Sequence, residues 1–204
     1  MESLLIDIAV FDGFDELDAL GPLEVFRTAA DYGADVRARL VTGGVQDVVR
    51  AAHGLRVQVD GRLVPGRADV LLVPGGGWTS RSKAGAWAEA QRGVLPAQIA
   101  AAAGTTRVLA GVCTGVLLLA HAGVVGTRRA ATHHGARAEL AATGATVLTD
   151  RVVDDGDLVT CGGVTSGIDM ALWLVERELG TDTAEQVAAE LEYQRVRPAP
   201  VPAR

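Results

Sequence analysis

The chain has 204 residues, a length usual for one domain and sufficient to bury a substantial core. Its formal net charge is −6 and its 19 Lys and Arg residues are scattered, so a surface that holds a nucleic-acid backbone is not expected. It has no basic secretory leader, no apolar run close to the roughly 18 residues of a membrane span, and only two cysteines, so we expect a cytoplasmic protein without a disulfide scaffold.

Short β-branched runs alternate with helical patterns along the chain, which is typical of βαβ units around a mostly parallel sheet. The first half predicts a strand over 4–10, a helix over 17–32, a strand over 36–41, a buried strand over 70–73, and an Ala-rich helix over 86–103. Pro96 should kink that last helix or split it in two.

The second half continues the alternation. It predicts a strand over 106–112, a helix over 115–122, further elements at 136–142, 147, 151–153 and 158–160, a hairpin turn at 154–157, and helices over 167–179 and 183–194. The entry of the last helix, Thr-Asp-Thr-Ala-Glu, can cap its own N–H groups. We therefore predict a three-layer α/β sandwich as one domain over 1–194, with a Pro-rich tail over 195–204.

Cys113 is the first candidate for chemistry. It follows a predicted strand and precedes a predicted helix, and the flanking glycines Gly111 and Gly115 permit a tight turn, as in a nucleophile elbow. A thiol beside a helix N-terminus is expected to have a lowered pKa. The alternative is that Cys113 is a small buried hydrophobe, as we expect for Cys161 on its strand.

Asp18 is the second candidate, because it starts a helix near the carboxyl end of the first strand, where ligands of open parallel sheets bind. A carboxylate in a dry cleft could relay a proton to the thiol. The alternative is an acid that only stabilises the helix dipole, as Asp15 or Glu16 could do.

Gly75 and Gly76 end the buried strand over 70–73, where their N–H groups could stabilise a developing negative charge or merely form a tight turn. His133 and His134 are adjacent and should face opposite ways in an extended segment, so only one would line the cleft. The four histidines and two cysteines show no metal-ligand spacing, so no metal site is expected.

Five segments together resemble the ThiJ/PfpI group of the class I glutamine amidotransferase-like superfamily, and most of all its isonitrile hydratase branch. They are Leu17-Asp18-Ala19-Leu20-Gly21-Pro22, Val73-Pro74-Gly75-Gly76, Val112-Cys113-Thr114-Gly115, Ala131-Thr132-His133 and Gly163 to Asp169. This resemblance spans about residues 6–192 and implies a flavodoxin-like fold, a homodimer and no cofactor.

In isonitrile hydratases the elbow cysteine, the next threonine and an aspartate of the first helix are catalytic, which corresponds to Cys113, Thr114 and Asp18. The resemblance thus implies hydration of a small isonitrile to an N-substituted formamide. Gly75, Gly76 and His133 are the candidates for binding the substrate or its developing charge. Two alternatives stay open: a glyoxalase-like hydration of reactive carbonyls, and a redox or stress-sensing dimer in which Cys113 is oxidised.

Overall fold

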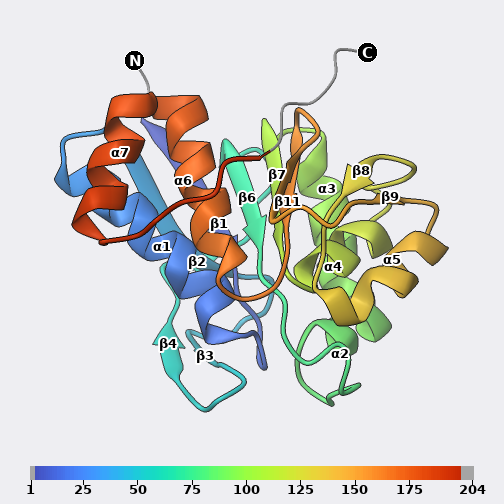
Figure 1. Cartoon of the computed structure of the whole chain (residues 1–204). Coiled ribbons are helices and arrows are strands. Elements are labelled where there is room, and N and C mark those ends of the chain that lie inside the picture. The colour runs from blue at the N-terminus through green and yellow to red at the C-terminus, as the bar shows by residue number, and fades with distance from the viewer. Residues whose placement is uncertain (1–2, 199–204) are drawn as a thin grey trace.

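A central sheet of seven strands runs through the computed structural model, which describes residues 3–198 (Figure 1). The strand order is β10-β11-β7-β6-β1-β2-β5, and every neighbouring pair is parallel except β10 with β11. The strands of this sheet are β1 (Leu4–Ala9), β2 (Val36–Thr42), β5 (Gly61–Arg62), β6 (Val70–Val73), β7 (Val108–Val112), β10 (Val152–Asp154) and β11 (Leu158–Cys161).

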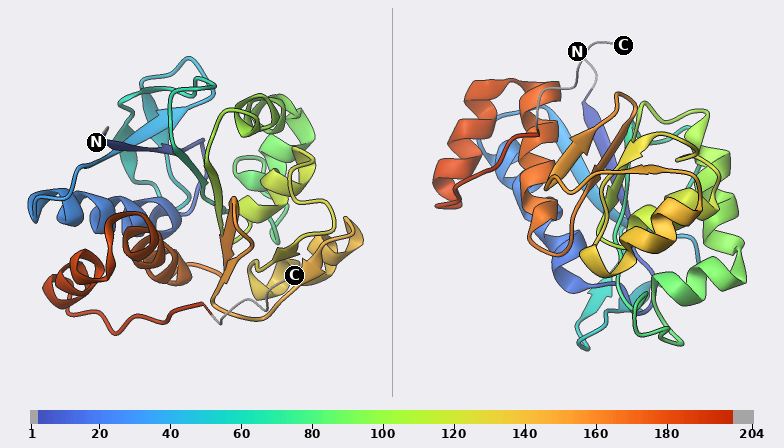
Figure 2. Two further views of the ribbon diagram at one scale, coloured as in Figure 1. Left: turned by 90° about the horizontal axis from the view of Figure 1, so that it is seen from above. Right: turned by 45° about the vertical axis from the view of Figure 1, so that its right-hand side comes forward.

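Helices cover both faces of the sheet and complete a three-layer α/β sandwich (Figures 1 and 2). One layer contains α1 (Glu16–Asp31), α6 (Ser166–Leu179) and α7 (Thr181–Glu190). The other contains α2 (Ala86–Arg92), α3 (Val94–Ala103), α4 (Gly115–His121), the 3₁₀ turn η1 (His134–Ala136) and α5 (Arg137–Ala142). Two small ladders pair β3 (Val48–Arg50) with β4 (Arg56–Gln58), and β8 (Arg129–Ala130) with β9 (Thr146–Val147).

The central strands are apolar on both sides because helices cover both faces. Every residue of β6 and β7 is buried, and Val70 of β6 pairs in register with Ile6 of β1 and Val108 of β7. The predicted fold class is therefore confirmed, and the predicted strands and helices agree with the observed elements to within a few residues.

The Ala-rich helical stretch is split in two, as predicted, but the break lies at Gly93 and not at Pro96. Gly93 adopts the left-handed conformation (φ 74°), which ends α2 and begins α3. Pro96 then lies in the first turn of α3, where a missing N–H leaves no helical hydrogen bond unmade.

The last helix begins two residues earlier than predicted, and its expected self-capping is wrong. Gly180, with φ 100°, is the N-cap of α7, and no side chain caps this end. The Thr183 hydroxyl instead donates to the carbonyl oxygen of Leu179 at 3.2 Å. The predicted tail begins with residues 195–198, which lie in no helix or strand, while 199–204 fall outside the described residues.

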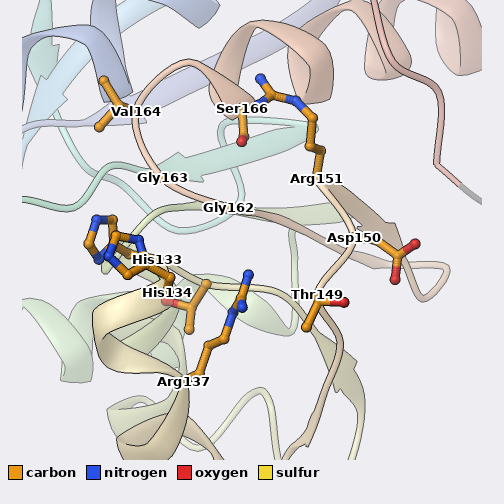
Figure 3. Close-up of a pocket in the computed structure, with 11 residues that line it drawn as sticks. His133, His134, Arg137, Thr149, Asp150, Arg151, Gly162, Gly163, Val164 and Ser166 are labelled. Carbon is orange, nitrogen blue, oxygen red and sulfur yellow. The ribbon is translucent and has the colours of Figure 1, made fainter.

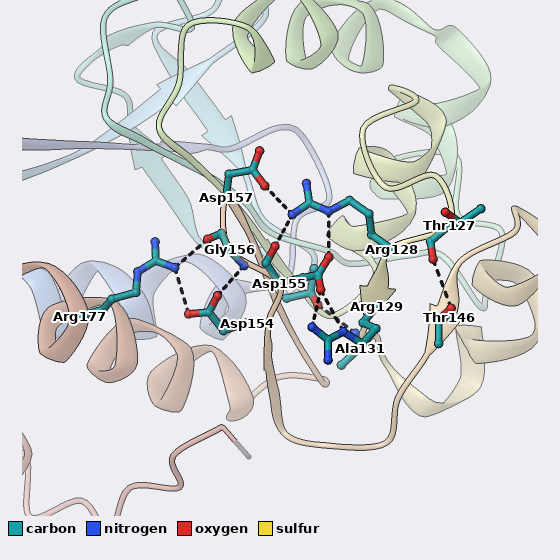
Figure 4. A network of polar contacts seen from close by, with 11 residues as sticks. Thr127, Arg128, Arg129, Ala131, Thr146, Asp154, Asp155, Gly156, Asp157 and Arg177 are labelled. Atoms are coloured by element: carbon teal, nitrogen blue, oxygen red, sulfur yellow. Dashed lines mark hydrogen bonds and ion pairs between the residues drawn. The ribbon is translucent and has the colours of Figure 1, made fainter. Parts of the chain in front are cut away.

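The predicted hairpin turn at 154–157 joins β10 to β11, and three arginines from two other segments hold it (Figure 4). The Asp155 carboxylate accepts hydrogen bonds from Arg128 Nε and Arg129 Nε, each at 3.0 Å. Arg177 of α6 donates to Asp154 Oδ2 at 3.0 Å. These contacts fix the edge of the sheet that leads into Cys161 and the loop after it.

Between residues 3 and 198, we find no helix long and apolar enough to cross a membrane.

Candidate functional site

Cys113 lies at a sharp turn between β7 and α4, with its backbone in the left-handed region (φ 56°). The glycines on either side allow the close approach that this turn needs. A Cβ at Gly111 would lie 2.8 Å from side-chain atoms of Leu119 and Val116, and one at Gly115 would lie 2.1 Å from the carbonyl oxygen of Val73. The strand-to-helix turn predicted from the glycine spacing is therefore present.

Neighbouring segments hold the backbone of Cys113 on both sides. Its N–H donates to the Gly162 carbonyl oxygen at 3.0 Å, and its carbonyl oxygen accepts from the Thr132 hydroxyl at 2.6 Å. Because a positive φ is costly for a non-glycine residue, these contacts are what maintain it. Cys113 as a whole is 6% exposed.

Asp18 is fully buried and faces the glycine turn that follows β6. Its Oδ2 accepts a hydrogen bond from the N–H of Gly75 at 2.9 Å. Asp15, and not Asp18, is the N-cap of α1, with its carboxylate accepting from the N–H of Leu17 at 3.2 Å. Asp15 is therefore the residue that caps the helix, while Asp18 lies in the first turn of α1 with its carboxylate bonded to a different segment.

Burial raises the pKa of Asp18 to about 7, and the nearby charge of Asp15 adds to this effect. Hydrogen bonds from the Gly75 amide, the Cys113 thiol and the Val164 amide partly offset it. The second carboxyl oxygen, Oδ1, has no partner of good hydrogen-bond geometry among the described residues. A carboxyl group near half ionisation at neutral pH can both take and give a proton.

The pKa of the Cys113 thiol is raised, first by burial and then by the charge of Asp18. This contradicts the lowered pKa expected from the helix N-terminus. The backbone N–H groups of Thr114 and Val164 do favour the thiolate, but removal from water and a neighbouring carboxylate outweigh them. Cys113 is consequently a protonated thiol at rest, next to a group that can accept its proton.

The sequence suggested that the N–H groups of Gly75 and Gly76 could stabilise a developing charge. In the structure, both N–H groups already donate to protein side chains. The N–H of Gly75 binds Asp18, and the N–H of Gly76 donates to the Thr114 hydroxyl oxygen at 3.0 Å. The buried Thr114 side chain is thereby oriented beside Cys113. Gly75 and Gly76 thus position the two side chains that flank the thiol.

His133 and His134 do not face opposite ways, which corrects the expectation for an extended pair. His133 caps the turn η1, its Nδ1 accepts from the N–H of Gly135 at 3.1 Å, and its ring centroid lies 4.2 Å from that of His134. The Nδ1 acceptor assigns the ring proton of neutral His133 to Nε2. Burial and the charges of His134 and Arg137 lower the pKa of His133.

A cavity of about 270 Å³ opens beside these residues (Figure 3). Three of its wall residues also contact Cys113: Thr132 and Gly162 through its backbone, and Val164 through the thiol. Both histidines line the cavity, together with Arg137 and Arg151. Within the described part of the chain, no three His, Cys, Asp or Glu side chains lie close enough to hold a metal ion.

Sequence interpretation missed Val164 and Arg137. Val164 has φ 50° and its amide interacts with both Asp18 and Cys113, but its apolar side chain gave no signal. The glycine pair at 162–163, directly after a buried strand, and the family motif over 163–169 were the sequence features that indicated this loop. Cys161 is fully buried behind it, as predicted.

Comparison with known proteins identifies the family of this chain. A sequence model of the DJ-1/PfpI family matches residues 5–177. The chain belongs to the DJ-1/PfpI family. The resemblance to ThiJ/PfpI proteins noted from the motifs, and the flavodoxin-like fold that it implied, are confirmed.

Proteins that are similar to this chain in sequence include one named as an enzyme and one that is not. The chain is 35% identical to isonitrile hydratase of Pseudomonas putida, over 97% of this chain and 81% of that protein. It is 30% identical to the Parkinson disease protein 7 homolog of Danio rerio, over 88% of this chain and 92% of that protein. A crystal structure of a ThiJ/PfpI family protein from Pseudomonas syringae superposes with a TM-score of 0.83 at 26% identity, covering 100% of this chain and 80% of that one.

Proposed function

We propose that this DJ-1/PfpI protein hydrates an isonitrile to an N-substituted formamide, with Cys113 as nucleophile and Asp18 as proton relay. The observation that carries the proposal is the buried pair itself: a thiol with a raised pKa beside a carboxyl group with a pKa of about 7. The 35% identity to isonitrile hydratase, over nearly the whole chain, supports the choice of substrate class.

In the first step, the sulfur of Cys113 bonds to the terminal carbon of the isonitrile. Because a free thiolate is disfavoured at this buried position, the thiol proton passes to the Asp18 carboxylate during the attack. Asp18 then gives that proton to the same carbon. The product is a thioimidate, R–N=CH–S–Cys113, in which S–H has added across the carbon.

In the second step, water adds to the thioimidate. The water oxygen bonds to the carbon and one water proton reaches the nitrogen, with Asp18 carrying the proton between them. The carbon–sulfur bond of the tetrahedral adduct then breaks, the remaining O–H proton passes to the sulfur, and R–NH–CHO leaves. The thiol is regenerated, and no oxidant, reductant or cofactor takes part.

The residues around the pair have supporting roles in this proposal. The Thr114 hydroxyl, which the Gly76 amide orients, and the N–H of Val164, which interacts with the thiol, would stabilise charge on the adduct. His133 can donate from Nε2 toward the substrate nitrogen. As the family resemblance implies, we expect the protein to act as a homodimer.

The protonated resting state of Cys113 favours this reaction over a redox-sensing role, because peroxide reacts with thiolates. A glyoxalase-like hydration would use the same thiol on a carbonyl compound. The deciding experiment incubates the purified protein with cyclohexyl isonitrile, and separately with methylglyoxal, and follows the products by NMR. We expect N-cyclohexylformamide; formation of lactate alone, or no turnover of either compound, would refute the proposal.

A further inference from the structure

Arg137 is a cation without a counter-charge at the edge of the site. It begins α5 and lines the cavity beside Cys113, yet among the described residues its guanidinium has no hydrogen-bond or ion-pair partner, and its Nε is buried without an acceptor. Glu139, the acidic residue of α5, is already engaged by Arg81 and Trp78, each at 3.0 Å. The charge of Arg137 is therefore left for something that enters the cavity.

The charge of Arg151, the other arginine of the cavity, is neutralised by an ion pair within the protein. Arg151 donates to the buried carboxylate of Asp169, at 2.8 Å from Nε and 2.6 Å from Nη2. In Figure 3, Arg137 extends toward the loop of Gly162 and Gly163, whereas the carboxylate of Asp150 points away from that loop. Asp150 also lines the cavity and no ion-pair partner is found for it among the described residues, but its carboxylate is not directed at the space between Arg137 and this loop.

The cavity adjoins the turn at Cys113, although neither Cys113 nor Asp18 is among its lining residues. Thr132, Gly162 and Val164 form part of its wall and contact Cys113 directly. Its volume of about 270 Å³ has room for a small polar group next to the residues that surround the thiol.

We propose that Arg137 binds a carboxylate on the substrate, so that the preferred substrate is a small isonitrile carrying a carboxylate, of the size of an amino acid. This inference rests on the proposed function and specifies its substrate. A guanidinium pairs with a planar carboxylate through two parallel N–H donors, and one uncompensated arginine matches one negative charge. Binding at Arg137 would hold the isonitrile carbon near the sulfur of Cys113.

The test compares kcat/KM for isocyanoacetate with kcat/KM for its neutral methyl ester. We expect the wild-type protein to prefer the carboxylate, and Arg137→Gln to lower that selectivity ratio by roughly 10- to 100-fold, as for loss of a charged hydrogen bond. Arg137→Lys, which keeps the charge, should lose less. The matched control is Arg37→Gln on an exposed position of β2, which should leave the ratio unchanged.

Two further outcomes separate this inference from the proposed function. If the protein hydrates both compounds with a ratio that Arg137→Gln does not change, the carboxylate site is refuted while the hydratase proposal stands. If it hydrates neither, the hydratase proposal fails, and calorimetry with N-formylglycine decides the carboxylate site alone. The site is supported if N-formylglycine binds the wild-type protein, if its methyl ester does not bind, and if Arg137→Gln abolishes binding of N-formylglycine. Equal binding of the acid and the ester, or no binding of either, would refute the site.

Discussion

The carboxyl group of Asp18 and the thiol of Cys113 lie together in a buried position, and burial is the largest cause of the raised pKa of both. The charge of Asp18 further raises the pKa of the thiol, whereas the hydrogen bond from the thiol lowers the pKa of Asp18. In the mechanism proposed here, the proton shuttles between the thiol and the carboxylate during the attack.

Cys113→Ala should abolish hydration and leave the fold intact, because the turn is held through the backbone of Cys113 and not through its sulfur. Circular dichroism and product formation measure the two effects separately. Cys161→Ala is the control: it removes the other, fully buried thiol and should keep activity while costing some stability. Full activity in Cys113→Ala would remove the nucleophile from the proposal.

The rate of hydration should rise as the pH increases through about 7, because the ionised form of Asp18 is the one that accepts the thiol proton. In Asp18→Asn this rise should disappear and turnover should fall by roughly a hundredfold or more, since an amide cannot carry the proton. Asp15→Asn is the matched control: an asparagine can still cap the helix, and loss of the Asp15 charge should move the rise to lower pH without a large loss of turnover. Similar small losses in both variants would exclude Asp18 as the relay.

Asp18 should also make stability depend on pH. Its pKa is raised from the ordinary value of 3.8 to about 7, so the folded state binds this proton more tightly than the unfolded chain. The resulting stabilisation is fully present below about pH 4 and is lost as the pH rises through about 7. Relative to the wild type, Asp18→Asn should therefore gain up to roughly 4 kcal/mol in the free energy of unfolding between pH 4 and pH 9.

Urea unfolding of the two proteins at both pH values measures this difference. Other titrating groups cancel in the comparison, because they are the same in both proteins. A difference that does not change with pH would mean that Asp18 has an ordinary pKa.

Gly75→Ala should both destabilise and inactivate the protein. A Cβ at this position would lie 2.5 Å from the backbone nitrogen and from the hydroxyl oxygen of Thr114, so the start of α4 or the Asp18 contact must move. We expect a cost of roughly 1 to 3 kcal/mol, as for other overpacked sites. Gly104→Ala is the control, because no atom lies within 4 Å of its Cβ position and its φ is −71°; an equal effect in both variants would contradict the close approach.

Most strands and helices, in their order along the chain, and the turn at Cys113 could be predicted from the sequence, whereas the short strands β3, β4, β5 and β8 were not predicted. The predicted features depend on local properties: continuous apolar runs such as β6 and β7, and small residues such as Gly111 and Gly115 where a helix must approach a strand. The family motifs around Asp18 and Cys113 are likewise contiguous in the chain. Nothing beyond neighbouring residues was needed for these conclusions.

The tertiary structure alone decided the electrostatics of the site and the contents of its cavity. Asp18, Gly75, Cys113 and Val164 come from four separate segments, and a pKa depends on how much water their meeting excludes. That is why the thiol pKa moved opposite to the direction expected from the helix N-terminus. For the same reason, only the tertiary structure shows that Arg137 has no ion-pair partner among the described residues, because the sequence does not tell which acidic residues pair with which arginines.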